Sequence, residues 1–434
     1  MHHNFTVEAG SYNSLLASYG VTMRRDATDL AFSASHIRTD GFSATDENDG
    51  NFEDDGYEAS RISFYAAHEL QGGAKIGVNG FWEDSTGDFD DWGGDVVGST
   101  GDDYTDSKSF GIRAFAEFQT GAIDHQVALT RYRLDRTSYE NDFPTEFVGA
   151  RTKLSWQGAT DLGTNGARLI FGADTEKETS DGNGQTRTNG VFAELTTPIG
   201  QRADMSLSLR HDHHSEFGDF TSGRIAGVYR LRDDLLLRAS LGNGFRAPSL
   251  YELYGPFGNS MLEREESRSA EIGIEKQWGD DSHLRLTAFW LKASNLIGWS
   301  NDRYNQVDGD ARRKGVELDG RYAFGAGYAL TGSYTYIDNQ VASEWAEVPG
   351  QIVNLGIEGS FATGTTAALN MRYEGDRPQD LGDYTVVDLL VTHPLRENTE
   401  AYLRIENLFD EEYQLVNNYG TSDRAFYAGI RASF

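Results

Sequence analysis

The stretch MSLSLR (205–210) alternates strictly between apolar and polar side chains. Successive side chains of an extended chain point to opposite faces, so the apolar residues would share one face and the serines and Arg210 the other. IRAFAEF (112–118) and AYLRIE (401–406) alternate in the same way, with one apolar face and one mostly polar or charged face. A period of two over segments of this length predicts β-strands with one apolar and one polar face.

Segments with this period recur from one end of the chain to the other, and no segment shows a helical period that would support a helix. We therefore expect about 22 strands and no helix. The expected strands span 3–10, 13–23, 28–38, 57–69, 74–84, 108–119, 122–135, 147–157, 166–178, 185–198, 203–213, 219–232, 234–242, 267–279, 283–299, 304–324, 328–338, 350–361, 364–374, 383–395, 398–409 and 423–434.

The connections between these segments differ in length in a regular way. Short turns such as QGG (71–73) and GAG (325–327) alternate with long polar stretches such as 85–107, 136–146 and 243–266. Short turns at one end and long loops at the other are typical of outer-membrane barrels. The sequence thus predicts an all-β fold: a transmembrane antiparallel β-barrel of about 22 strands that forms a single domain over the whole chain.

A barrel can cross a bilayer because closure pairs every backbone N–H and C=O within the protein. The polar faces of the alternating strands would then line a wet lumen, with side chains that include Arg113, Glu117, Arg210, Arg404 and Glu406. A barrel of about 22 strands leaves a lumen wide enough to act as a pore or to require a plug.

Composition narrows the possible functions. The 434 residues carry a formal net charge of −30, so a nucleic-acid partner is not expected, because phosphate backbones require a basic surface. There is no cysteine, which excludes disulfides and thiol chemistry. There is no apolar run long enough for a transmembrane helix, and the start MHHNFTVEAG (1–10) lacks the basic segment and apolar core of a signal peptide. No motif pairs a nucleophile with a base, so we do not expect an enzyme.

The segment GNGFRAPSLYELYG (242–255) marks an abrupt end to one strand. Its first two glycines weaken the strand, and Pro248 cannot donate to a ladder, so strand pairing should stop there. Arg246 and the tyrosines that follow would then lie at the rim of the barrel.

Five segments together resemble TonB-dependent outer-membrane receptors, most closely the cobalamin-receptor branch. They are LGNGFRAPSLYELYG (241–255), ESRSAEIGIE (266–275), DARRKGVELDG (310–320), RIENLFDEEY (404–413) and RHDHHSEFGDF (210–220). Their order and spacing fit the family, and the resemblance covers nearly the whole chain. It implies a barrel in the bacterial outer membrane, in contact with outer-membrane lipid and lipopolysaccharide.

The last expected strand, AFYAGIRASF (425–434), ends in an aromatic residue. Phe426, Ile430 and Phe434 recur at even positions of this alternating strand. A terminal Phe resembles the signal by which the barrel insertion machinery recognises outer-membrane proteins. We interpret these three residues as an insertion signal, and a strand that merely happens to end in Phe is the alternative.

Three features depart from the family pattern. The family carries an N-terminal plug and a segment that engages an energy-transducing protein, whereas this sequence opens on its first expected strand. We therefore expect a barrel without a plug, or one that receives a plug or an energy-transducing partner separately. The family's Asn-Pro-x-Leu and Pro-Glu read here NSML (259–262) and RE (264–265), and the loop GDRPQDLGD (375–383) is short.

Two acidic loops, TDENDGNFEDDGYE (45–58) and the stretch 84–106, are the candidate calcium site. Calcium takes roughly six to eight oxygen ligands, which Asp-rich loops can supply. The resemblance supports this interpretation, because early extracellular loops of the cobalamin receptor hold calcium and these loops fall at matching places. The candidate ligands are Asp46, Asp49, Asp54, Asp55, Asp102, Asp103 and Asp106. A solvated acidic surface is the alternative.

Other candidate residues lie near the strand ends. Arg246, Tyr254 and Phe257 are the candidate substrate-loop residues, because loops on a rigid scaffold carry function. An interfacial aromatic girdle is the alternative, and we favour it for Tyr251. A metal cluster at the histidines of RHDHHSEF (210–217) is less favoured than a structural role at a strand end.

The leading hypothesis is an outer-membrane transport barrel that resembles receptors for cobalamin or siderophore-type nutrients. Without a plug it would act as a wide passive pore. The alternative hypothesis is a non-transporting outer-membrane scaffold or an engineered pore framework. Calcium is the only cofactor that the sequence suggests.

Overall fold

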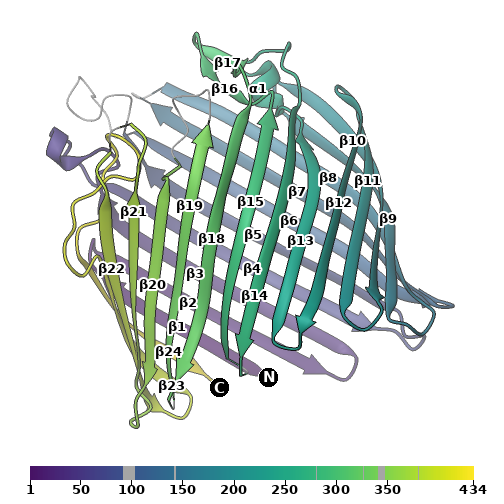
Figure 1. The fold of residues 1–434 in the computed structure, drawn as a ribbon. Coiled ribbons are helices and arrows are strands. Elements are labelled where there is room, and N and C mark those ends of the chain that lie inside the picture. Colours follow the sequence, from purple (N-terminus) through teal and green to yellow (C-terminus); the bar gives the residue numbers. More distant parts are fainter. Residues whose placement is uncertain (91–102, 141–142, 280, 326, 341–347, 380) are drawn as a thin grey trace.

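The computed structural model describes all residues except 91–102, 141–142, 280, 326, 341–347 and 380, and it is a β-barrel (Figure 1). Its strands are β1 (His2–Gly10), β2 (Ser14–Arg25), β3 (Thr28–Phe42), β4 (Asp55–Glu69), β5 (Lys75–Asp88), β6 (Tyr104–Thr120), β7 (Ile123–Glu140), β8 (Phe143–Leu162), β9 (Ala167–Ser180), β10 (Gly184–Ile199), β11 (Ala203–His214), β12 (Gly218–Arg232), β13 (Leu235–Arg246), β14 (Glu265–Trp278), β15 (Ser282–Ser294), β16 (Ile297–Ser300), β17 (Arg303–Gln306), β18 (Ala311–Phe324), β19 (Tyr328–Gln340), β20 (Gln351–Ser360), β21 (Thr366–Gly375), β22 (Tyr384–Arg396), β23 (Thr399–Glu406) and β24 (Ala425–Ser433).

The strands of the barrel form one closed antiparallel sheet of 22 strands, as the sequence predicts. Each strand pairs with its neighbours in the chain, and the ring closes where β1 pairs with β24 in the register Asn4↔Ser433 to Gly10↔Tyr427. Closure leaves the sheet with no free edge, which is the condition for crossing lipid with strands. The other two strands, β16 and β17, form a separate hairpin.

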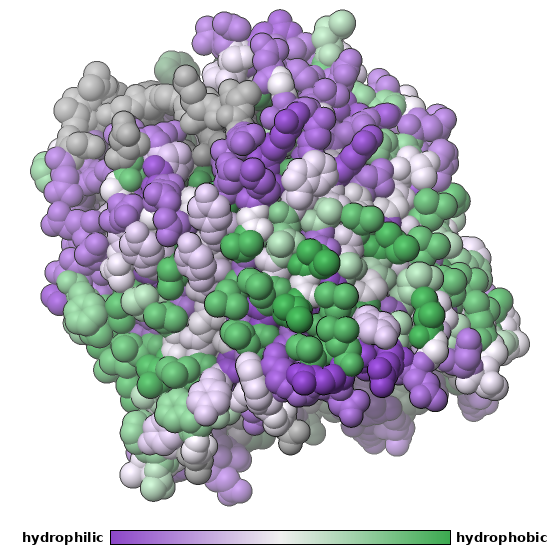
Figure 2. Space-filling model, in the orientation of Figure 1, coloured by the Kyte–Doolittle hydropathy of each residue, from purple (hydrophilic) through white to green (hydrophobic). Residues whose placement is uncertain are grey.

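The alternating side chains separate into an outer and an inner face. Leu207 and Leu209 of β11 are 46% and 58% exposed, as expected for side chains on the lipid-facing wall. Arg210, on the opposite face, donates to Asp174 Oδ2 at 2.8 Å. Figure 2 shows the result on the outside, where a hydrophobic belt lies below a hydrophilic zone. The wall is therefore apolar toward lipid and charged toward the lumen.

The two ends of the barrel differ. Both chain termini and the short turns lie at one end, which we call the turn end, whereas β16, β17 and the short helix α1 lie at the other, which we call the loop end (Figure 1). In outer-membrane barrels the short turns are periplasmic and the longer loops are extracellular.

Two expectations about the loops were wrong. The sequence predicted no helix, but α1 (Leu250–Tyr254) and the 3₁₀ turn η1 (Glu47–Asp49) lie in the loops. The stretch 136–146 was expected to be a loop, but β7 continues to Glu140 and β8 begins at Phe143. Beyond the bilayer both faces of a hairpin meet water, so its strands lose the alternation that reveals strands within lipid. No helix of the described residues is long and apolar enough to cross a membrane.

Candidate functional site

The loop that follows β13 is held to the barrel rim by Arg246, the last residue of that strand. Its guanidinium donates to Glu252 of α1, with Nη1 at 3.0 Å from Oε2. It also donates to Glu265, the first residue of β14, with Nε at 2.7 Å from Oε2. One cation thus joins a strand end, a helix and the next strand. Charge-assisted, bidentate bonds of this kind are among the strong hydrogen bonds of proteins.

The helix α1 forms because its first turn is capped. Ser249 stands at the N-cap, where its hydroxyl accepts from Glu252 N and Glu252 Oε2 accepts from Ser249 N at 2.6 Å. This reciprocal pair is a capping box. Leu250 and Leu253 of the helix are buried, and the helix contacts β9 and β10. Burial alone would raise the pKa of Glu252, but the hydrogen bonds from Arg246 and Ser249 outweigh burial and lower it.

Four aromatic rings continue from α1 across the loop end. Tyr251 meets Tyr304 of β17 edge to face at 6.1 Å, Tyr304 meets Trp299 of β16 at 5.4 Å, and Trp299 meets Phe257 at 5.2 Å. Tyr251 also contacts Phe147 of β8 at 6.4 Å. We call the four residues Tyr251, Phe257, Trp299 and Tyr304 the rim aromatics. Edge-to-face pairs at these separations are favourable beyond the area they bury.

The structure places the three candidate substrate-loop residues differently. Phe257 is one of the rim aromatics and is exposed, as a ligand-facing ring would be. Tyr254 is exposed and stacks on no described ring, and Arg246 is engaged by two carboxylates. Tyr251, which the sequence favoured for a lipid girdle, packs inside the loop instead.

The hairpin that carries Trp299 and Tyr304 differs from the expectation in its extent: the expected strands 283–299 and 304–324 place its turn correctly at 300–303 but run on into the barrel strands β15 and β18. Its turn residues Asn301 and Asp302 have φ of 53° and 57°, the left-handed conformation that both central residues of a type I′ turn require. The Asn-Asp pair between two aromatic residues, in WSNDRY (299–304), is the sequence signal for this turn.

The first acidic loop uses its carboxylates to bind backbone. Asp46 accepts from Asn48 N at 2.9 Å as the N-cap of η1, and its other oxygen accepts from Gln414. Asp55 accepts from Ala44 N at 2.5 Å. Burial alone would raise the pKa of Asp46, but these hydrogen bonds outweigh burial and lower it. Asp54 is exposed, and the side chain of Asp49 lies outside the described residues.

Carboxylates at the start of the second acidic loop accept hydrogen bonds from the first acidic loop. Asp90 accepts from Thr45 N and from Thr45 Oγ1, both at 2.7 Å, and Asp88 accepts from Gly56 N at 3.1 Å. Neither aspartate was among the candidate ligands. Asp103 is buried, and Asp106 accepts from Thr86 Oγ1 at 2.7 Å, whereas Asp102 lies outside the described residues.

These contacts leave the calcium site a prediction. Among the described residues, no three His, Asp or Glu side chains converge to hold a metal ion. The carboxylates of Asp46, Asp55 and Asp106 instead satisfy donors of the protein. The described part of the two loops thus presents no assembled group of ligands of the kind that calcium prefers.

The histidines at the end of β11 divide between the two faces. His214 is buried and its Nδ1 accepts from Glu216 N at 3.2 Å, which is a structural role in the turn. On the opposite face, His213 lies 2.8 Å from Asp219 Oδ1 and His211 lies 3.8 Å from the same oxygen. This arrangement favours the structural interpretation over a metal cluster.

The segment RIENLFDEEY (404–413) folds over the loop end. Asn407 is buried with φ of 48°, and its amide donates to Glu411 O at 2.9 Å and to Ser422 O at 3.2 Å. Asn is one of the few residues that tolerates this conformation. Arg377 holds the same loop from the other side, since it donates to the backbone oxygens of Gln414 and Leu415.

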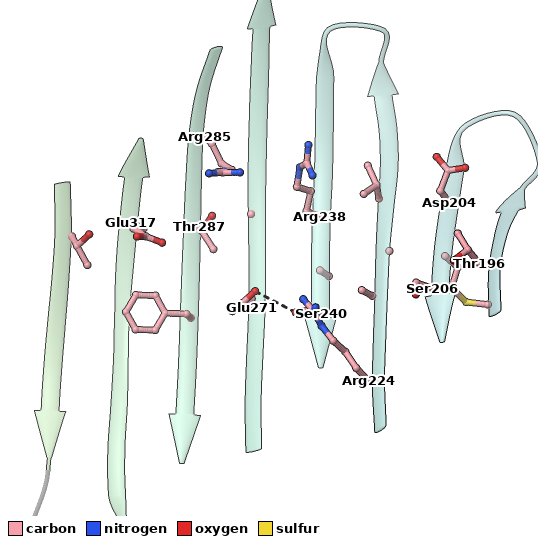
Figure 3. A pocket seen from close by; sticks show the side chains of 18 of the residues that line it. Thr196, Asp204, Ser206, Arg224, Arg238, Ser240, Glu271, Arg285, Thr287 and Glu317 are labelled. Atoms are coloured by element: carbon pink, nitrogen blue, oxygen red, sulfur yellow. Dashed lines mark hydrogen bonds between the residues drawn. The ribbon is translucent and has the colours of Figure 1, made fainter. Parts of the chain in front are cut away.

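The lumen wall carries a charged groove of about 710 Å³ across β10 to β19 (Figure 3). Arg224, Arg238, Arg285, Glu271 and Glu317 project into it from neighbouring strands. Ser240 donates to Glu271 within the groove at 3.3 Å. Carboxylates of β14 and β18 neutralise two of the arginines: Arg238 pairs with Glu275 at 2.8 Å, and Arg285 pairs with Asp319 at 2.9 Å. The inner face is thus polar and wettable.

The residues of the predicted insertion signal lie on the last strand. Phe426 and Ile430 are exposed on the outer face of β24, and Phe434 follows its end. Phe434 N donates to His3 O at 2.9 Å, so the signal residues lie beside the seam that closes the barrel.

Comparison with known proteins settles the family. The family model described as "TonB dependent receptor-like, beta-barrel" matches residues 3–408. The chain belongs to this family. As a TonB-dependent receptor barrel, it is a protein of the bacterial outer membrane.

Two similar proteins are vitamin B12 transporters. A vitamin B12 transporter BtuB from Photobacterium profundum is 26% identical over 431 residues, which covers 91% of this chain and 68% of that protein. A vitamin B12 transporter BtuB from Vibrio cholerae is 28% identical over 274 residues, 57% of this chain and 43% of that protein. The match thus covers about two thirds of the first relative and less than half of the second, so this chain spans only part of their length.

Solved structures of TonB-dependent receptors share the fold. The siderophore receptor PirA from Acinetobacter baumannii superposes with a TM-score of 0.86 at 14% identity, over 100% of this chain and 80% of that chain. A ferric enterobactin receptor PfeA mutant from Pseudomonas aeruginosa gives a TM-score of 0.82 at 16% identity, with the same coverage. At these identities the likeness concerns the fold.

Proposed function

We propose that this barrel is the outer-membrane conduit of a transporter for a large, scarce nutrient of the cobalamin or siderophore class. The observation that supports it most directly is a closed sheet of 22 strands whose inner face carries charged side chains and whose outer face is apolar. The vitamin B12 transporters that match most of the chain point to the same class of cargo. The proposal for cargo rests on that similarity and on the width of the lumen.

The rim aromatics are the proposed point of first contact with the cargo. Trp299 and Phe257 are exposed and held edge to face, and Tyr304 N donates to Phe257 O at 3.1 Å. Burial raises the pKa of Tyr304, so its phenol stays neutral and can donate a hydrogen bond at physiological pH. Exposed, rigid aromatic rings bind large flat or apolar ligands with little loss of conformational entropy.

The 434 residues by themselves are proposed to form a wide passive pore. A barrel of 22 strands leaves a lumen wide enough to need a plug. A plug, in a longer chain or from a separate protein, would close this path, and an energy-transducing partner such as TonB would then be needed to open it.

We also propose that the two acidic loops together bind calcium. Asp54 is exposed and free to contribute, whereas Asp46 and Asp106 already serve donors of the protein. Calorimetric titration with calcium tests it. Binding that disappears in Asp54→Asn supports the site, and a titration without heat of binding contradicts it.

Conductance and ligand binding together test the proposed function. The refolded chain in a planar bilayer should give large, stable conductance steps, and a closed, non-conducting barrel would contradict the open pore.

Cyanocobalamin or a ferric siderophore should bind, and Trp299→Ala should weaken that binding about tenfold if the ring stacks on the ligand. Conductance without affinity for either ligand class would instead favour the alternative, a scaffold or pore framework without a transport role.

A further inference from the structure

Three cations stand directly opposite one another on the outer wall. Arg268 of β14 pairs in register with Lys292 of β15, and Lys292 pairs with Arg312 of β18. Arg268 lies an even number of residues from Ile272 on β14, and Lys292 lies an even number of residues from Trp290 on β15. The cations therefore share the outer face with these apolar side chains. We call Arg268, Lys292 and Arg312 the cation row.

The cation row lies just beyond the hydrophobic belt, toward the loop end. Trp290 follows Lys292 toward the turn end by two residues, or about 7 Å along the strand. Trp290 and Tyr336 of β19 are both exposed on this face, and aromatic rings of this kind form girdles at membrane interfaces. In Figure 2 the hydrophilic zone covers this end of the same strands, with the belt below it. The row is therefore at the level of lipid headgroups.

The charges of the cation row are only partly neutralised by the protein. Like charges directly opposite each other destabilise a sheet. Asp310 is shared between Lys292 at 2.9 Å and Arg312 at 3.5 Å, and Arg268 forms no ion pair with any described residue. The row thus keeps an excess positive charge.

Neighbouring pairs do not remove this excess. Lys314, two residues beyond Arg312 on the same face, is matched by Asp338 at 3.0 Å. Glu266, two residues from Arg268, is matched by Arg264 at 2.9 Å. A local excess of positive charge on the lipid-facing wall of a chain with a net charge of −30 indicates an anionic partner.

An apolar groove lies on the same outer wall, on the side of the cation row that faces the turn end. The groove has a volume of about 790 Å³ and is lined by Leu284 of β15, Leu318 of β18, Leu330 and Leu355. Gly320 and Gly332 lie among these side chains and leave room between them. Leu318, the lining residue of β18 nearest the row, lies six residues from Arg312, about 20 Å along the strand, so the end of an acyl chain anchored at the row reaches the groove.

We propose that the cation row binds the phosphate groups of an outer-leaflet glycolipid whose acyl chain lies along the wall. Arginine matches phosphate with a bidentate fork, and lysine adds a point charge. The headgroup supplies the counter-charge that the protein lacks at Arg268. The proposal depends on the outer-membrane location of the barrel and not on the identity of the nutrient.

Native mass spectrometry of the refolded 434-residue chain in detergent tests the proposal. The probe is a bis-phosphorylated lipid A-type glycolipid, compared with the same glycolipid after removal of its phosphates and with inorganic phosphate. Each interfacial cation contributes about fivefold in affinity, so Arg268→Gln should weaken binding about fivefold. The triple variant Arg268→Gln, Lys292→Gln, Arg312→Gln should weaken it on the order of 100-fold.

Arg313→Gln is the matched control. Arg313 is next to Arg312 in the chain but points to the lumen, where its Nε donates to Asn339 Oδ1 at 3.1 Å. It should bind the phosphorylated glycolipid as the unchanged chain does. The single variant Arg268→Gln removes no described ion pair, so it tests the row even if the triple variant fails to fold.

Three outcomes would overturn the proposal. Equal affinity of Arg268→Gln and the unchanged chain would remove the cation row from binding. Equal affinity for the phosphorylated and dephosphorylated glycolipids would remove the phosphate. Competition by inorganic phosphate at the concentration of the glycolipid would show a free-anion site and not a lipid site.

Discussion

Single charged side chains fasten the loop end of this barrel, from the last residue of a strand or from the loop directly after it. Arg246 joins α1 to β14, and Arg377 joins the loop before β22 to the segment that carries Gln414. Asp90 binds the backbone of the neighbouring loop at Thr45. The sequence marked Arg246 as a rim residue, but its two partners lie 6 and 19 positions away, so its structural role required the fold.

Arg246→Gln should release α1 from the rim. The substitution removes charge-assisted bonds to two partly buried carboxylates, worth about 2 kcal/mol of local stability. Hydrogen exchange should show faster exchange over 249–262, with the barrel strands unchanged. Arg246→Lys keeps the charge but loses the fork, so intermediate protection is expected. Unchanged exchange in both variants would argue against the fastening role.

Acid should loosen the same loop through Glu252. Its folded pKa is lowered from the ordinary value of 4.5, so its stabilising contribution is complete above pH 4.5 and is lost as pH falls through the lower folded value. Protease cleavage within 249–262 should therefore rise below about pH 4. In Glu252→Gln the cleavage rate should be high already at neutral pH and should change less on acidification, because Glu265 is then the one carboxylate partner of Arg246 that titrates. A loop that tightens in acid would contradict this assignment.

Strands within lipid were predictable because the bilayer imposes a period of two on their side chains. All 22 expected strands correspond to barrel strands, while the errors lie in the water-exposed connections. The expected strand 283–299 ran past the end of β15 at Ser294, and α1 was not predicted. In both places the chain is surrounded by water, so no face has to be apolar and the period of the side chains is lost. The rim aromatics come from two loops that are distant in sequence, and no local pattern brings them together.

A glycine beside an inward aromatic ring sets the packing of β24 against β23, next to the seam. A Cβ added at Gly429 of β24 would lie 2.4 Å from the Tyr402 ring, so Gly429→Ala must displace that ring. We expect a loss of about 1–3 kcal/mol in the free energy of unfolding, measured by urea titration in lipid vesicles. Gly20→Ala in β2 is the control, since the nearest atom there is 3.9 Å away. An equal loss in both variants would attribute the effect to strand propensity and not to the ring.

The charge of the whole molecule should govern what passes through it. The chain carries a net charge of −30, while arginines of the lumen groove such as Arg238 and Arg285 are paired with carboxylates. A passing cation is therefore attracted by the molecule, and a passing anion is repelled. Overall charge could be predicted from composition alone, whereas the pairing inside the lumen needed the register of the strands.

The open pore should prefer cations. In a planar bilayer with a potassium chloride gradient, the reversal potential should show cation selectivity that weakens at high salt, because salt screens the field. An anion-selective or unselective pore at low salt would contradict the expected field. The control Arg238→Gln with Glu275→Gln removes one neutral pair and should leave the selectivity unchanged.

The seam between β1 and β24 brings the two ends of the chain into contact, with His3 N donating to Phe434 O at 2.6 Å. A short linker could therefore join them, and the chain could be opened instead at the turn QGG (71–73). Such a circular permutant should form the same barrel, because ring closure depends on which strands pair and not on which is made first. Heat-modifiable mobility on a gel measures whether the barrel has folded. A permutant that never shows this mobility shift would mean that folding requires the natural order of strand synthesis.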